Sequence, residues 1–230
     1  MSESTDTAQQ KKRLLEFHPS AFLLGAQLLQ LFLYAIFDEN IHQHTLISAF
    51  SIIVLMLVIW VIDRSSSTPW LKWSLAIPAF VLAVLATAYN NESLIAWSAL
   101  ANSILYFYAA VNLIIYMMDD DRVTTDEVFA IGAAFTLLAW AFAYLFMLCQ
   151  VWVAGSFVSS VVTDRPLVFI ELLFTSFTNL SATGLGDIVP TSAWTRALAS
   201  LEQMVGVGYV AIVVSRLVSM TTKKRAGKQE

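Results

Sequence analysis

Residues 166–187 read PLVFIELLFTSFTNLSATGLGD, and this stretch decides how the rest of the chain is interpreted. Its first part, 166–180, is apolar and typical of a helix, for which Asp164 and Pro166 provide start signals. A helix of that length is too short to cross a bilayer, which takes about 20 residues. The second part, 181–187, carries two glycines and predicts irregular backbone. Together they predict a re-entrant loop, which membranes tolerate only where the loop lines water or is buried in protein.

The composition of the whole chain predicts a membrane protein. Of its 230 residues, 58% are hydrophobic and 13% are charged, and the mean hydropathy is +0.69. A soluble domain of this size could not bury so much apolar surface. The single cysteine, Cys149, excludes an intrachain disulfide and makes a poor metal site, so we expect it to be a packing residue.

Six segments are apolar and long enough to be membrane-spanning helices. Because lipid offers the backbone no hydrogen bonds, only helices and closed barrels can cross it, and these segments are too long for barrel strands. We therefore expect an all-α membrane protein with the pore helix and filter between its fifth and sixth spans. The expected spans cover about residues 19–37, 45–62, 70–89, 94–118, 128–153 and 192–220.

The spans divide the chain into five expected regions and give it an orientation. An even number of spans places both termini on one side, where most of the Lys and Arg residues also fall. This predicts a multi-pass protein of the inner cell membrane with both termini in the cytoplasm. The regions are a cytoplasmic N-terminal segment (1–18), a four-helix transmembrane domain (19–118), an acidic cytoplasmic linker (119–127), a pore domain (128–220) and a basic cytoplasmic tail (221–230).

The region from 128 to 220 resembles the pore domain of the potassium channel superfamily, and in particular its bacterial six-span members with one pore loop. The residues that carry this resemblance are Gly184-Leu185-Gly186-Asp187, then Pro190, then Trp194 and Arg196 at the start of a long apolar segment, and then Gly206. The family filter reads Thr-Val-Gly-Tyr-Gly-Asp. The resemblance implies an outer helix, a pore helix, a filter and an inner helix, with Gly206 as the gating hinge. The alternative for Gly206 is close packing of helices.

The filter chemistry gives an independent reason for these residue types. A filter replaces the hydration shell of an ion with inward-pointing carbonyl oxygens, and glycines such as Gly184 and Gly186 can adopt the left-handed conformations this requires. One chain supplies one loop and four are needed to surround an ion, so we expect a homotetramer. A ring of Asp187 carboxylates would concentrate cations at the outer mouth. The expected potassium ligands are the carbonyls of Ala182, Thr183, Gly184 and Leu185, with Gly186 completing the filter.

The filter also departs from the family pattern, which leaves the ion selectivity open. Ala182 replaces the threonine that completes the innermost ion site, and Leu185 replaces the tyrosine that braces the filter. In the pore helix, Phe174 and Thr178 stand where the family has the Trp and Glu that support the aspartate. The usual bracing is therefore absent or rebuilt, and the filter is expected to be prone to collapse or inactivation.

Charged residues at membrane depth are candidate functional residues. We expect Glu202, Thr178 and Glu171 to be filter-bracing candidates, with a protonated or satisfied packing group as the alternative for Glu202. The acidic residues of 119–127 could bind divalent ions, pair with Arg216 and the basic tail, or be solvated. The span 94–118 has no Lys or Arg, whereas a voltage sensor needs several charges that are each worth about 2.3 kcal/mol per 100 mV.

These observations predict a passive cation channel that conducts potassium and has weak or no voltage dependence. A non-selective monovalent cation channel is the first alternative. A potassium-transporter subunit and a non-conducting membrane scaffold or sensor are further alternatives. The sequence shows no nucleophile–base set, phosphate loop or metal-ligand spacing, so we expect no enzyme and no cofactor apart from permeant potassium ions. The expected partners are membrane lipids, monovalent cations and copies of the same chain, and no nucleic acid.

Overall fold

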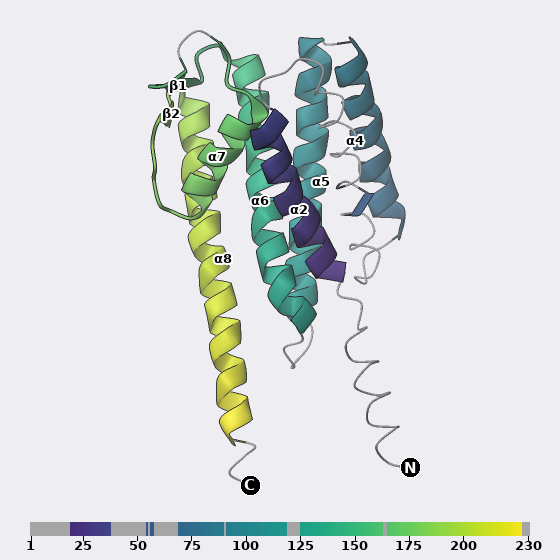
Figure 1. Ribbon diagram of the computed structural model, residues 1–230, viewed down its shortest axis with the longest axis vertical. Helices are drawn as coiled ribbons and strands as arrows, with labels where there is room; N and C mark the ends of the chain where they lie inside the picture. Colours follow the sequence, from purple (N-terminus) through teal and green to yellow (C-terminus); the bar gives the residue numbers. More distant parts are fainter. Residues whose placement is uncertain are drawn as a thin grey trace.

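The computed structural model describes residues 19–37, 54, 56–57, 69–89, 91–118, 125–162 and 165–226. This part of the chain is predominantly helical, with six helices and one pair of short strands, as shown in Figure 1. In chain order the elements are α2 (Pro19–Phe37), α4 (Pro69–Tyr89), α5 (Glu92–Met118), α6 (Thr125–Trp152), β1 (Phe157–Ser159), α7 (Phe169–Leu180), β2 (Ile188–Pro190) and α8 (Ala193–Ala226). The span expected over 45–62 lies almost wholly outside the described residues.

Three of the described helices are long and apolar enough to cross a membrane. They cover Glu92–Met118, Asp126–Trp152 and Ala193–Val218. Shorter apolar helices cover Pro19–Tyr34, Trp73–Tyr89 and Phe169–Leu180. The expected helical membrane protein is therefore confirmed, and the count of six spans stays a prediction.

Helix α6 is the centre of the bundle, and α2, α5, α7 and α8 all pack against it. Its middle turns are rich in buried alanines, such as Ala133, Ala139 and Ala143, which have no exposed surface. Small side chains let neighbouring helices approach closely, which is how helices associate in lipid. The other end of the arrangement is α8, which lies at the edge of the bundle and extends beyond α6 at its C-terminal end (Figure 1).

Two polar contacts attach α2 to α6. Near the start of α2, the backbone N–H and the hydroxyl of Ser20 donate hydrogen bonds of 3.1 and 2.9 Å to the buried Asp126 carboxylate. In the middle of the helix, the Thr136 hydroxyl donates to Oε1 of Gln27 at 2.6 Å. A carboxylate at a helix N-terminus satisfies unpaired N–H groups, so Asp126 both caps α2 and fixes its height on α6.

The start of α7 differs from the sequence prediction. The helix begins at Phe169 rather than at 166, and Asp164 lies outside the described residues. The preceding backbone is extended because Gln150 of α6 holds Leu167 with two hydrogen bonds, from the Leu167 N–H (3.1 Å) and to the Leu167 carbonyl (2.9 Å). A backbone paired in this way cannot turn into a helix, and Pro166 is therefore not the first helical residue.

Candidate pore loop and its supports

The short helix α7 is wedged between α6 and α8 at one end of the bundle (Figure 1). One face of the helix is buried, including Leu172, Leu173, Ser176 and Leu180. The Ser176 hydroxyl lies 2.8 Å from the Ala139 carbonyl of α6, which fixes the helix at its midpoint. The structure therefore places a short buried helix between two long apolar ones, as the sequence predicts.

The segment after α7 turns back onto the last turn of that helix. The Thr178 carbonyl accepts hydrogen bonds from the N–H groups of Thr183 (3.0 Å) and Gly184 (3.3 Å), and the Asn179 carbonyl accepts one from the Ala182 N–H (2.9 Å). The Thr178 hydroxyl instead bonds within its own helix, to the Thr175 carbonyl at 2.9 Å. Thr178 thus supports the loop through its backbone and not through its side chain.

Left-handed backbone alternates along this segment. Ala182 has a φ of 54° and Gly184 has a φ of 65°, whereas the intervening Thr183 and the second glycine, Gly186, have no positive φ. The expectation that Gly186 supplies a left-handed residue is therefore wrong for this structure, because Ala182 takes that conformation instead. A non-glycine residue pays about 1–2 kcal/mol for it. Alternation of this kind turns successive carbonyls toward the same side, which is the property a filter needs.

The loop residues have no packing partner within one chain. All residues from 181 to 187 are exposed, and 63% of the apolar Leu185 is accessible. An irregular loop with exposed backbone is tolerated at membrane depth only where protein or water covers it. The loop is therefore incomplete as a single copy.

Backbone pairing supports the end of the loop. Strand β1 pairs with β2 in antiparallel register, with Val158 opposite Val189, and the Ser160 N–H donates to the Asp187 carbonyl at 2.8 Å. Two residues of the following segment, Thr191 and Thr195, bond the Ser156 carbonyl at 2.9 and 3.0 Å. This strand pair was missed by the sequence analysis. It connects the Asp187 backbone to the segment before α7, whereas the Asp187 carboxylate is exposed.

The two glutamates expected near the filter occupy different places. Glu171 lies in the first turn of α7, where it accepts hydrogen bonds from Arg165 at 2.9 Å and from the Val168 N–H at 2.8 Å. It therefore caps the helix at the end away from the loop. Glu202 of α8 has no exposed surface and hydrogen-bonds the Ser176 hydroxyl. Only Glu202 contacts the face of α7 that faces the bundle interior.

Gly206 lies where α8 and α7 approach most closely. A Cβ atom built on Gly206 would lie 1.8 Å from the Leu180 carbonyl oxygen and 2.7 Å from its carbonyl carbon. No side chain fits there, so the glycine is required by packing in this arrangement. Its role as a gating hinge stays a prediction. The same stripe of α8 carries Tyr209, whose hydroxyl donates to the Ile131 carbonyl of α6 at 2.6 Å.

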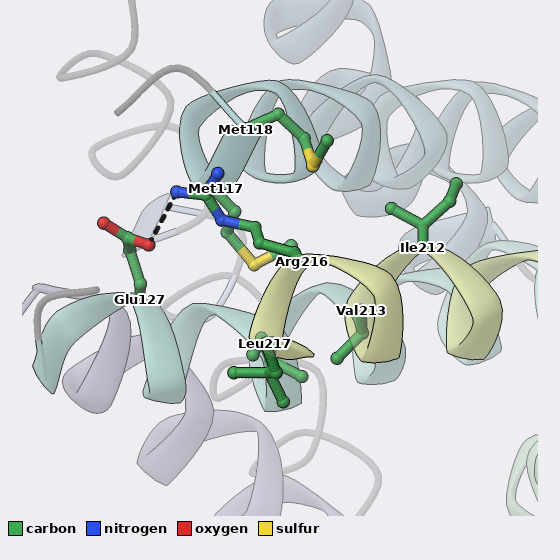
Figure 2. Close-up of a pocket in the computed structure, with 8 residues that line it drawn as sticks. Met117, Met118, Glu127, Ile212, Val213, Arg216 and Leu217 are labelled. Carbon is green, nitrogen blue, oxygen red and sulfur yellow. Dashed lines mark hydrogen bonds and ion pairs between the residues drawn. The ribbon is translucent and has the colours of Figure 1, made fainter. Parts of the chain in front are cut away.

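The other end of α8 is held by an ion pair. Arg216 donates to Glu127 at 3.0 Å, and their side chains are only 14% and 6% exposed. Figure 2 shows this pair beside a small apolar pocket between α5, α6 and α8 that is lined by Met117, Met118, Ile212, Val213 and Leu217 among others. Of the alternatives for the acidic residues, the pairing with Arg216 is thus confirmed for Glu127. The described residues contain no group of three His, Cys, Asp or Glu side chains able to hold a metal ion.

Comparison with known proteins identifies the same part of the chain. Residues 134–223 match a family model described as an ion channel, and this range contains most of α6, the strand pair, α7, the loop and nearly all of α8. No curated protein and no solved structure matched the chain. The resemblance to the potassium channel superfamily is therefore confirmed at the level of an ion channel domain.

Proposed function

Since residues 134–223 form an ion channel domain, we propose that the chain is a passive cation channel that conducts potassium as a homotetramer. The observation that carries this proposal is the loop after α7, with left-handed backbone at Ala182 and Gly184 and full exposure in a single copy. An ion channel domain is a transport function, and we propose no enzymatic activity and no cofactor. The partners are membrane lipids, copies of the chain and the permeant ions, without nucleic acid.

The proposed conduction mechanism relies on backbone oxygens. Potassium would exchange its hydration water for the carbonyl oxygens of Ala182, Thr183, Gly184 and Leu185, and ions at adjacent sites would repel one another onward. The loop continues from the C-terminal end of α7, where the helix dipole carries partial negative charge and favours a cation. Four Asp187 carboxylates at the outer mouth would raise the local cation concentration.

The exposure of α8 supports assembly from several copies. Only 22% of the apolar window of α8 is buried, against 61% for α6. The exposed apolar residues of α8 include Leu201, Met204, Val207 and Val210. A homotetramer would cover part of this surface with neighbouring copies and would turn another part toward the conduction path. This arrangement also completes the loop, which one chain leaves open.

The remaining features of the proposal follow the sequence. Helix α5 has no Lys or Arg, so it has no gating charges, and we expect weak or no voltage dependence. The proposed topology has six spans, with a four-helix domain (19–118), an acidic linker (119–127) and a pore domain (128–220) in the inner membrane. The segments 1–18 and 221–230 are then cytoplasmic.

A reversal potential tests this proposal. Purified protein is reconstituted in planar bilayers with potassium on one side and sodium on the other, and a reversal near the potassium equilibrium potential is expected. Gly184→Ala should abolish the selective current, because the side chain disfavours the left-handed backbone by about 1–2 kcal/mol in each of four loops. Gly25→Ala in α2 is the matched control, because a Cβ there meets no atom within 4 Å.

One observation favours a second function, a non-selective monovalent cation channel. Ala182 has no side-chain oxygen, so the innermost ion site lacks the hydroxyl ligand of the family filter. A reversal near zero with clear current would support this function. Absence of current from the wild type under all stimuli would instead favour the transporter-subunit or scaffold alternatives.

A further inference from the structure

Glu202 is a carboxyl group with no exposed surface in a membrane-spanning helix. Its Oε1 atom hydrogen-bonds the Ser176 hydroxyl of α7. The Asn179 side chain lies beside the same carboxyl group, although neither the Asn179 Nδ2 nor the Glu202 Oε2 atom makes a hydrogen bond. The carboxyl group therefore faces only polar groups of the pore helix.

Counting protons at Ser176 determines the state of this group. The Ser176 hydroxyl lies 2.8 Å from the Ala139 carbonyl as well as against Glu202, yet it has one proton to donate. A carbonyl can only accept, so the Ser176 proton goes to Ala139. The contact between Ser176 and Glu202 then needs its proton from Glu202. We infer that Glu202 is a neutral carboxylic acid that donates to Ser176, and that it is a positioning residue for the pore helix and the filter.

The charges of the surrounding helices agree with a neutral acid. The described cations of the pore region are engaged elsewhere, with Arg165 on Glu171, Arg196 on the Pro190 carbonyl and Arg216 on Glu127. The other titratable groups on the helices around Glu202 are Asp126, which binds Ser20; Tyr209, which binds the Ile131 carbonyl; Tyr144, which stacks on Phe169; and the half-buried Cys149. A carboxylate at this place would be a buried charge without a counter-ion, which is strongly unfavourable.

The position of Ser176 explains how the acid would act on the filter. Ser176 precedes Thr178 by two residues, and the Thr178 carbonyl holds the Thr183 and Gly184 amides. One turn along α8 from Glu202, Gly206 contacts Leu180 at the end of α7. The acid and the glycine thus fix the pore helix at two successive turns. This inference rests on the proposed function for its effect on conduction, but the neutral state of Glu202 does not.

Infrared spectroscopy of the full-length protein tests the neutral state without any current. At neutral pH, the wild type should show the carbonyl stretch of a protonated carboxylic acid, and Glu202→Gln should remove it. Glu171→Gln is the matched control, because that pore-helix glutamate pairs with Arg165 and its loss should leave the acid band unchanged. A wild type without the acid band, or a band that survives Glu202→Gln, would overturn the inference.

A pH profile tests the positioning role. Deprotonation at alkaline pH would remove the donor to Ser176, so wild-type potassium current and the melting temperature of the assembled protein should both fall as the pH rises. Glu202→Gln keeps a donor and does not titrate, so it should retain current within about twofold of wild type and lose the alkaline decline. Glu202→Ala should lose about tenfold, since an unsatisfied buried group costs 1–3 kcal/mol and 1.4 kcal/mol is tenfold.

The two assays separate failure of this inference from failure of the proposed function. If no variant conducts, the proposed function fails, and the pH dependence of melting still decides the role of Glu202. If the wild type conducts but Glu202→Gln behaves like Glu202→Ala, or keeps the alkaline decline, the inference is overturned and the channel stands.

Discussion

The two ends of α8 are attached to the rest of the subunit by different kinds of contact. Near the loop, Gly206 lies directly against the backbone of Leu180, and Glu202 is enclosed without a counter-ion. At the opposite end, the described attachment is the ion pair between Arg216 and Glu127, beside a small apolar pocket. A backbone contact admits no alternative geometry, whereas a partly accessible ion pair can exchange for water and salt ions. The loop end is thus built to stay in place and the far end to be released.

The largest expected effect is at the loop end. Gly206→Ala would place a methyl group 1.8 Å from the Leu180 carbonyl oxygen, and neither backbone can move without displacing the other helix. We expect the assembly to lose more than about 3 kcal/mol, because overpacking costs 1–3 kcal/mol even where side chains can adjust. Thermal melting and size-exclusion chromatography in detergent would measure this.

The control for that variant lies one half-turn away. A methyl group on Gly208 would meet no atom within 4 Å, so Gly208→Ala should melt close to wild type. Equal destabilisation by both alanines would mean that helix flexibility, and not the contact with Leu180, makes Gly206 necessary. That outcome would favour the hinge prediction.

An intermediate effect is expected at the far end. Glu127→Ala leaves Arg216 without its partner in a largely buried position, and we expect a loss of about 2–3 kcal/mol, discounted from the 3–5 kcal/mol of fully buried pairs. If this end is the releasable one, the variant should also raise the open probability in single-channel recordings. The reversed pair Glu127→Arg with Arg216→Glu should restore part of the stability, and a double-mutant cycle without coupling would refute the contact.

The smallest effect is expected between the two ends. Tyr209→Phe removes the hydrogen bond to the Ile131 carbonyl but keeps the ring, whose centroid lies 6.0 Å from that of Phe135. We expect a loss of about 1 kcal/mol in the free energy of unfolding, the usual value for one hydrogen bond. A loss as large as that of Glu127→Ala would make the middle of α8 a third strong attachment and would weaken the contrast between the ends.

The sequence predicts the helices well because their signals are local. The observed bounds of α2 agree with the expected 19–37, and those of α5 and α6 differ by a few residues from 94–118 and 128–153. The start of α7 was wrong because it depends on Gln150, which lies 17 residues before Leu167 in sequence. No local pattern near Pro166 reports that contact.

The candidate site is less visible in the sequence than the helices. The glycines mark the loop, but which residues become left-handed depends on the hydrogen bonds to Thr178, and these favour Ala182 over Gly186. The strand pair was missed because three-residue strands have almost no pattern of their own and their register is set by contacts distant in sequence. The pairing of Glu127 with Arg216 was one of several alternatives that only the packing of α6 on α8 could separate.

The attachment of α2 to α6 has a consequence for how the chain is made. Gln27 and Gln30 are fully buried in α2, and the Thr136 partner of Gln27 lies 109 residues later in the sequence. During synthesis, α2 reaches the membrane well before α6 exists, since chains grow at about 5–20 residues per second. Until then its two amides and its N-terminal amides have no partner from α6. The first described helix therefore completes its hydrogen bonding only after most of the subunit has been translated, and its insertion is provisional up to that moment.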